Sequence, residues 1–298
     1  MCDLTLGLNT HKINHSTLFT YTYINPLIEP PNMNIPSRNI ILNAVLLSVS
    51  LCPALAHSAE LGDFYNLGLR PAETAIRVGA VALTGQRYQG SDEQKISVVP
   101  GIFLQASNGW FADPLNGIGY SFEPQGNLQY GLRVNIETGR SVEDDLQGFE
   151  KIKARANPGA FANYVVNDKL TLRSALRVGM GEGADGSLLH LGASYKALQI
   201  GFVGVSLNAS LKFADSNYVQ SYFGVTSAQS AASGLKAYQP KAGFAAAKVG
   251  VSVGTPLSRQ IFVFSNLSVQ RLMGDAANSP IVNKKMQPTA FIGGVYSF

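Results

Sequence analysis

The chain has 298 residues, of which 46% are apolar and 14% are charged, and its formal net charge is +4. The charged share lies well below the ~25% of an ordinary soluble domain, and a mean hydropathy near zero excludes both a helical membrane protein and a disordered chain. Lysine and arginine do not cluster, so the positive charge gives no footprint for nucleic acid.

The first apolar stretch is typical of an export signal. A short start with one charged side chain, Arg38, precedes an apolar core over residues 40–51. Ala54 and Ala56 then form a small-residue cleavage site, which predicts a signal peptide over residues 33–56 that is cut after Ala56. The run is too short for a transmembrane helix, and the large leucine before the following cysteine argues against a lipoprotein.

Residues 1–32 lie upstream of this complete signal and show no periodicity. We therefore expect them to be a non-functional extension, with translation starting at Met33. Cleavage of the signal also removes Cys2 and Cys52, the two cysteines of the chain. The exported part, residues 57–298, is then expected to form one domain without a disulfide or a cysteine metal site.

The exported part alternates apolar and polar side chains with a period of two residues. Residues 128–138, 169–180, 187–197 and 201–213 are the clearest cases. These segments have about ten residues or more, and a tilted strand needs ~9–11 residues to cross a bilayer. Alternation also fits a soluble sandwich, but the export signal, the strand length and the aromatic residues near strand ends favour a membrane barrel.

The chain ends inside such a segment, with Tyr296 and Phe298 on one face. A membrane barrel must pair its last strand with its first, because hydrocarbon tolerates no open sheet edge. We therefore interpret Tyr296 and Phe298 as the terminal signal of a closed barrel, with the aromatic rings at the membrane interface.

The predicted fold class is thus all-β: a transmembrane, antiparallel, up-and-down β-barrel of about twelve strands, within a range of ten to twelve. The expected strands are 75–84, 95–106, 117–123, 128–138, 158–166, 169–180, 187–197, 201–213, 217–225, 240–253, 259–271 and 286–298. If the last strand runs toward the periplasm, this count makes residues 139–157 a long periplasmic connection. That is the reverse of the usual barrel, which has short periplasmic turns.

Three segments weakly resemble catalytic or ligand-binding motifs, but each lacks residues that the motif requires. Residues 179–186 carry crowded glycines but lack the lysine and hydroxyl of a phosphate loop, so a tight turn is favoured. His190 shares a strand face with Ser194, but no acid completes a triad. The acidic run at 143–145 is more typical of a solvated loop than of a cation site. We expect no enzyme, and no catalytic residue, cofactor or metal.

The polar face of the predicted strands carries more cations than acids, which are few, such as Glu137. The candidate lumen charges are Arg77, Arg133, Arg173, Arg177, Lys196 and Lys212. A passage lined in this way favours anions, although long side chains can fill a narrow twelve-strand barrel.

Three stretches break the alternation: residues 88–94, 222–238 and 271–285. They contain Gly90, Ser91 and Asp92, then Tyr222, Phe223 and Gly224, then Gly274, Asp275, Ser279 and Pro280. Together with "NGWFADPLNGIGYSF" and the terminal "GVYSF", these stretches resemble the MipA/OmpV family of outer-membrane barrels. The resemblance runs from about residue 75 to the end of the chain.

The resemblance implies an outer-membrane β-barrel of Gram-negative bacteria, surrounded by lipid. It also implies a non-enzymatic scaffold that contacts a periplasmic murein lytic transglycosylase and a penicillin-binding protein. No catalytic residue comes with the resemblance. The alternative interpretation is a small anion-biased pore that affects the permeation of solutes or antibiotics.

Overall fold

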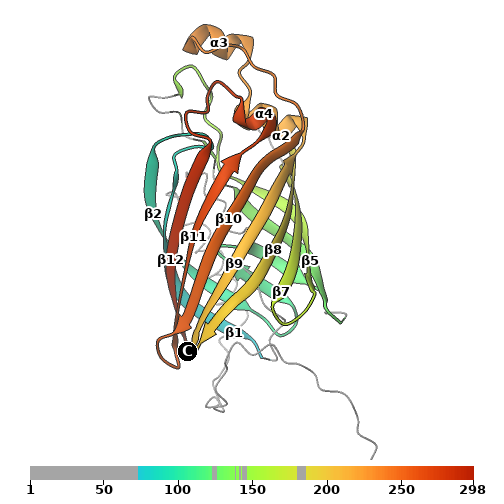
Figure 1. Ribbon diagram of the computed structural model, residues 1–298, viewed down its shortest axis with the longest axis vertical. Coiled ribbons are helices and arrows are strands. Elements are labelled where there is room, and N and C mark those ends of the chain that lie inside the picture. The colour runs from blue at the N-terminus through green and yellow to red at the C-terminus, as the bar shows by residue number, and fades with distance from the viewer. Residues whose placement is uncertain (1–72, 123–125, 138, 141, 143–145, 180–185) are drawn as a thin grey trace, which may run out of the picture.

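A computed structural model describes residues 73–122, 126–137, 139–140, 142, 146–179 and 186–298. The predicted cleavage site at Ala54 and Ala56 lies outside the described residues. Twelve strands form one closed barrel, in which each strand pairs antiparallel with the next and the last returns to the first (Figure 1). The predicted fold class is therefore confirmed.

The element bounds follow from the backbone pairing. The strands are β1 (Ala75–Gln86), β2 (Gln94–Gln105), β3 (Trp110–Asp113), β4 (Gly117–Ser121), β5 (Leu128–Glu137), β6 (Arg155–Val165), β7 (Leu170–Gly179), β8 (Gly186–Ile200), β9 (Val203–Ala214), β10 (Gly243–Pro256), β11 (Ile261–Leu272) and β12 (Met286–Ser297). The helices are α2 (Ser216–Phe223), α3 (Ser227–Ser233) and α4 (Gly274–Ala277).

The barrel has its apolar side chains outside and its polar side chains inside. On the outer surface Ile96, Leu132 and Leu267 are 73%, 57% and 64% exposed, whereas Asn208 and Asn266 on the inner face are buried. A soluble sandwich would bury the apolar face instead, so lipid covers the outside of this barrel. Among the described residues, no helix has the length and apolar character needed to cross a membrane.

The first and last strands close the barrel. They pair from Arg77 opposite Ser297 to Thr84 opposite Ala290, and Arg77 Nε donates to Ser297 Oγ at 3.1 Å. Closure leaves no edge at the ends of the strand order, as hydrocarbon demands.

One predicted strand is wrong and one strand was missed, so the two errors cancel in the strand count. The predicted strand at 217–225 is instead α2, because the Asp215 side chain accepts a hydrogen bond from the Tyr218 backbone N–H and caps a helix. Conversely, β3 was missed because its four residues are too few to show alternation.

These two errors reversed the predicted direction of the strands between them. In the structure, Leu146 and Phe149 of the β5–β6 connection pack with Tyr88, Val225 and Ile281, which follow β1, α2 and α4. The long connection therefore lies at the same end as the other long loops. The prediction that it is periplasmic is wrong, because short turns mark the periplasmic end of such barrels.

The β3–β4 hairpin is a short part of the barrel wall. It meets β2 at two residue pairs, Leu104 with Ala112 and Gln105 with Phe111. Its turn bends into the lumen, where Leu115 packs in one apolar cluster with Val81 of β1. From Gln94 to Phe103, the side of β2 that faces away from β1 has no strand partner among the described residues. Pro100 is tolerated in this stretch because an edge strand needs no N–H donor on its open side.

We expect Leu267→Arg to destabilise the barrel by about 2–4 kcal/mol, because Leu267 lies in the middle of β11 on the lipid-facing surface. Urea unfolding in lipid vesicles measures the change in the free energy of unfolding. Gln260→Arg in the exposed β10–β11 turn is the matched control and should change it by less than about 0.5 kcal/mol. Equal effects at the two positions would contradict the membrane placement.

Candidate functional site

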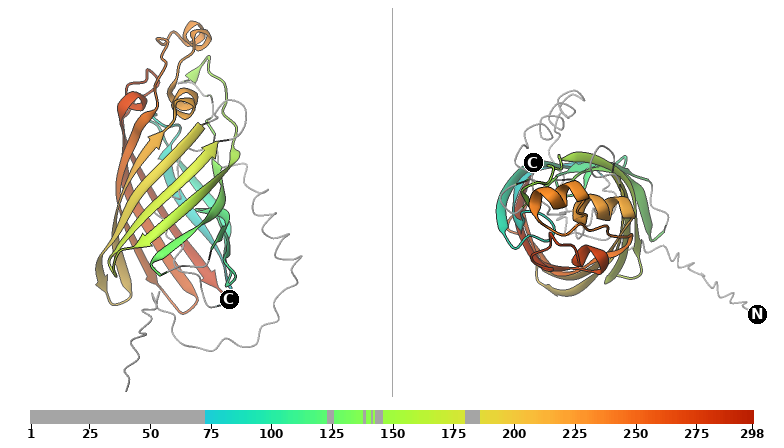
Figure 2. Two further views of the ribbon diagram at one scale, coloured as in Figure 1. Left: turned by 90° about the vertical axis from the view of Figure 1, so that its right-hand side faces the viewer. Right: turned by 90° about the horizontal axis from the view of Figure 1, so that it is seen from above.

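The long loops at one end of the barrel form a cap, defined here as residues 87–93, 215–242 and 273–285 with the described part of the β5–β6 connection. Seen from above, helical segments lie across the mouth of the barrel (Figure 2). Buried apolar residues from all four loops form one cluster. The cap is therefore a packed unit and closes this end of the lumen.

Helix α2 is the plug of the cap. Its four buried side chains are Tyr218, Val219, Tyr222 and Phe223, and they pack against Leu188 of β8 and Leu272 of β11. Gly186, at φ +148°, lies directly under the helix, where an added Cβ would meet the Tyr218 backbone N at 2.2 Å. The close approach of β8 to α2 thus requires a glycine.

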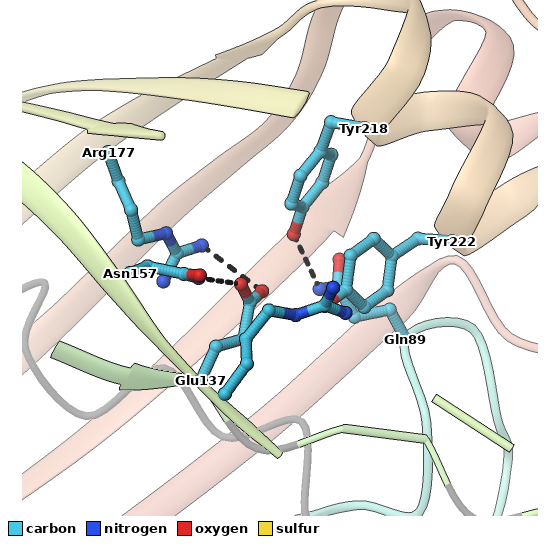
Figure 3. A network of polar contacts seen from close by, with 7 residues as sticks. Gln89, Glu137, Asn157, Arg177, Tyr218 and Tyr222 are labelled. Atoms are coloured by element: carbon cyan, nitrogen blue, oxygen red, sulfur yellow. Dashed lines mark hydrogen bonds and ion pairs between the residues drawn. The ribbon is translucent and has the colours of Figure 1, made fainter. Parts of the chain in front are cut away.

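A polar network beneath α2 joins the plug to the barrel wall (Figure 3). The Glu137 carboxylate, at the end of β5, accepts hydrogen bonds from Asn157 and from Arg177, the latter at 3.3 Å. The Arg177–Glu137 ion pair is largely buried. A buried pair of this kind holds its partners because removal of one leaves the other charge unpaired in a low dielectric.

The two tyrosines of α2 reach into the same network. Gln89 Nε2 donates to the Tyr218 hydroxyl at 3.0 Å, and Arg155 Nη2 donates to the Tyr222 hydroxyl at 3.5 Å. Burial, and after it the nearby Glu137 carboxylate, raises the pKa of both phenols above the ordinary tyrosine value. Both hydroxyls therefore stay protonated at neutral pH.

Arg140 fixes the other end of α2. Its Nη1 donates to the Tyr222 carbonyl oxygen at 3.1 Å, and its guanidinium lies 5.4 Å from the centre of the Phe149 ring. This contact ties the β5–β6 connection to the C-terminal turn of α2, where carbonyl groups lack partners within the helix.

The first motif stretch, Gly90-Ser91-Asp92, anchors the β11–β12 loop. The Gly90 carbonyl accepts hydrogen bonds from the backbone N–H groups of Asn283 and Lys284, at 2.8 and 2.9 Å. Ser91 is buried and its Oγ accepts from the Glu93 backbone N–H at 3.1 Å, which makes a local turn. Asp92 is exposed at the rim of the cap.

The other two motif stretches contact one another. Ser279 Oγ donates to the Phe223 carbonyl oxygen at 2.5 Å, and the Gly224 backbone N–H closes α2 on Gln220. Asp275 accepts from the Lys241 backbone N–H at 2.9 Å. The remaining motif residues, Tyr222, Gly274 and Pro280, lie next to these contacts in sequence. Together with the contacts of Gly90 with the β11–β12 loop, these bonds bring all three motif stretches together in the cap.

The candidate lumen charges do not form one cluster. Arg177 belongs to the network under α2, while Arg173 Nη2 donates to Asn208 at 3.1 Å and the Arg133 guanidinium lies 5.9 Å from the Phe161 ring centre. Lys212 lines a cavity below the cap.

Two of the lumen candidates lie at the opposite end of the barrel, here called the turn end. Arg77 contacts Ser297 there, and the Lys196 backbone N–H donates to the Lys169 carbonyl in the β6–β7 turn. Tyr296 and Phe298 are at the same end, with their rings edge to face at 5.4 Å between centroids.

Sequence reasoning missed most of the network that holds the plug. It placed residues 217–225 in a strand, whereas Tyr218 and Tyr222 are buried side chains of the helix α2. Asn157, Arg140 and Arg155 lie in or beside the long connection and gave no signal. Glu137 did give a sequence signal, because an acidic side chain among inward-facing cations is expected to pair with one of them.

The chemistry of this site is that of closure. Among the described residues, no three side chains of His, Cys, Asp or Glu gather as metal ligands would. Arg177 and Asn157 donate to the Glu137 carboxylate, and Arg140 donates to the backbone of α2. The arrangement therefore holds a helix in the mouth of a membrane barrel.

Comparison with known proteins gives one family and several distant folds. A family model described as MltA-interacting protein MipA matches residues 78–298. None of the curated proteins matches the chain. Among solved structures, OprB of Pseudomonas putida is 12% identical at a TM-score of 0.35, and the match spans 66% of this chain and 49% of OprB.

Two further solved structures are similar over nearly their whole length. The KdgM porin is 10% identical at a TM-score of 0.39, over 74% of this chain and 99% of the porin. An outer-membrane channel from Pseudomonas putida F1 is 9% identical at a TM-score of 0.41, over 80% of this chain and 98% of the channel. These similarities are too distant to indicate a function.

We expect Glu137→Ala to lower the free energy of unfolding by about 3–5 kcal/mol, because it leaves the largely buried Arg177 guanidinium without its carboxylate. Glu93→Ala is the matched control: it breaks the exposed pair with Arg87 and should cost at most about 1 kcal/mol. Urea unfolding measures both changes, and an equally small loss in both variants would contradict the role of the network.

The cap should loosen in alkaline solution. The folded pKa of Tyr218 and of Tyr222 is raised, so above the ordinary value of about 10 the unfolded chain releases protons that the folded state retains, and stability falls as the pH rises. Limited proteolysis of residues 215–242 between pH 8 and pH 11 measures this. The Tyr218→Phe/Tyr222→Phe variant should lose the pH dependence; if it keeps the same dependence, other groups are responsible.

Proposed function

The chain belongs to the MltA-interacting protein MipA family, and on that premise we propose that it is a non-enzymatic scaffold for murein-remodelling enzymes. The family match runs from the fourth residue of β1 to the end of the chain and so covers nearly the whole described barrel. The molecule is an outer-membrane β-barrel, and a barrel fixed in that membrane can hold a soluble enzyme next to the murein layer.

The proposed partners are a periplasmic lytic transglycosylase and, through it, a penicillin-binding protein. The family name supports the first of these, because it describes an interaction with MltA. Short turns face the periplasm in outer-membrane barrels, so the partner would meet the turn end. The long loops at the other end pack on one another in the cap through buried apolar residues, although α3 has no buried residue and projects away from the barrel (Figure 1).

Exposed apolar side chains at the turn end are the observation that carries this proposal on the structural side. Phe202 in the β8–β9 turn, Leu257 at the start of the β10–β11 turn and Phe298 at the C-terminus are 63%, 67% and 68% exposed. Large apolar groups at the tips of turns, beyond the strands, are suited to contact with a partner protein. We propose that the transglycosylase binds over this rim.

The binding surface can be tested with turn variants that leave the strands intact. We expect Phe202→Ser/Leu257→Ser to reduce capture of the lytic transglycosylase by detergent-solubilised barrel at least tenfold, about 1.4 kcal/mol. Lys236→Ser, on an exposed residue of the cap loop, is the control and should leave capture unchanged. Co-purification measured by immunoblot gives the result, and undiminished capture by the double variant would refute the assignment of the surface.

The cationic lumen supports a second proposal, an anion-biased pore. Arg173, Arg177, Lys212 and Lys248 lie along the inner face of the barrel, and cations that line a passage favour anions. The described state is closed, because α2 fills the mouth and the turn around Leu115 packs within the lumen. Conduction would therefore require that the plug leaves.

Single-channel recording in planar bilayers tests the pore. If the chain conducts only when the plug is displaced, the complete barrel should be silent, and Glu137→Ala, which weakens the network under α2, should give anion-biased steps. The Glu93→Ala variant, which changes only an exposed pair, should remain silent. No conductance from the Glu137→Ala barrel would leave the scaffold as the function.

A further inference from the structure

A small cavity lies in the lumen directly beneath the cap. Its volume is about 30 Å³, and residues of β1, β9, β10, β11 and β12 line it. Gln89 is one of the lining residues, and its Nε2 donates to the Tyr218 hydroxyl on α2. The cavity therefore lies between the plug and the inner face of one side of the barrel.

Two buried lysines give this cavity its charge. Lys212 of β9 and Lys248 of β10 both line it and are 5% and 7% exposed. The remaining polar lining consists of amides and hydroxyls, and none of the described residues that line the cavity is Asp or Glu. Two ammonium groups in one enclosed space repel each other, and each loses hydration on burial. A bound anion would offset both costs.

A row of inward-facing side chains crosses the strands at the height of Lys248. Lys248 is opposite Ser210 on one side and Gln270 on the other, and Gln270 is opposite Gln287 of β12. The row is continuous across four neighbouring strands, so its polar groups converge on the same stretch of lumen.

Gln287 provides an independent indication of a ligand. Its Oε1 accepts from Gln270 Nε2 at 3.4 Å, so its own Nε2 is free to donate elsewhere. That nitrogen is buried and has no hydrogen-bond partner among the described residues, and Gln287 itself is 3% exposed and lines the cavity. Buried amide donors are nearly always paired, and an anion in the cavity is an acceptor for this one.

We propose that the cavity binds a small inorganic anion with the size and charge of a halide, held by the Lys212 and Lys248 ammonium groups and the Gln287 amide. The cavity volume limits the size of the anion. A water molecule needs about 10–15 Å³ of such volume, so a cavity of about 30 Å³ has room for a halide, and a tetrahedral oxyanion is too large for it. The site rests neither on scaffold activity nor on conduction, since it depends on the closed lumen alone.

Bromide gives the direct test, because its anomalous scattering marks its position. Crystals of the detergent-solubilised barrel grown in sodium bromide should show an anomalous peak between Lys212, Lys248 and Gln287. The Lys212→Met/Lys248→Met variant should lose this peak, while Lys236→Met, on an exposed lysine of the cap, should keep it. A well-ordered lumen without a peak in the unaltered chain would overturn the proposal.

A solution measurement makes the proposal independent of crystals. Thermal unfolding of the detergent-solubilised barrel is compared in sodium chloride, sodium bromide, sodium sulfate and sodium gluconate at equal ionic strength. We expect the midpoint to be about 2–4 °C higher in chloride or bromide than in gluconate, because a ligand that binds only the folded state raises it. Sulfate raises the midpoint by its general exclusion from the protein surface, and this rise should be the same in the unaltered chain and in the Lys212→Met/Lys248→Met variant.

The variants separate a bound halide from a general salt effect. Lys212→Met and Lys248→Met should each abolish the difference between chloride and gluconate, and Lys236→Met should retain it in full. The same difference in all four proteins would show a general salt effect and overturn the site. Loss of partner capture is not expected in the two lumen variants, so failure of this proposal and failure of the scaffold proposal are distinguishable.

Discussion

The requirement that strands pair within hydrocarbon governs this molecule, and β2, which meets β3 at two residue pairs only, is the exception. The requirement explains why the chain closes β12 onto β1 and why the apolar side chains lie outside. With the apolar face turned to lipid, the interior receives the polar half of most strands, while Val81, Phe103 and Val295 form an apolar cluster there with Leu115. The lumen then has to satisfy these polar groups by itself, and the cross-strand bonds from Arg173 to Asn208 and from Arg177 to Glu137 are the outcome.

The cap closes the polar interior of the barrel at one end. Polar strand ends at the mouth would admit water to the lumen, and α2 covers them with four buried side chains. The helix is held from below by Gln89 and Arg155, which donate to its two tyrosine hydroxyls, and from the side by Arg140. The three motif stretches are thus related by contact: the first holds the β11–β12 loop, and the second and third hold each other.

Alternation predicted the long strands because a lipid-facing surface imposes a strict period of two, as residues 128–137 show. The same signal fails where lipid does not select the side chains. β3 is too short to show alternation, and the buried aromatic residues of α2 give its sequence the pattern of a strand. The cap residues converge from loops far apart in sequence, as Gln89 and Tyr218 do, so spacing could not bring them together. The motif stretches were identifiable, but their contacts were not.

The short hairpin of β3 and β4 makes the extent of strand pairing uneven around the barrel. β1 and β12 share eight paired positions, whereas β2 and β3 share two. The weakest join between neighbouring strands is therefore not where the two ends of the chain meet. During membrane insertion or under mechanical load, β2 and β3 should separate first, beside Pro100. The first and last strands, β1 and β12, should stay paired while this happens.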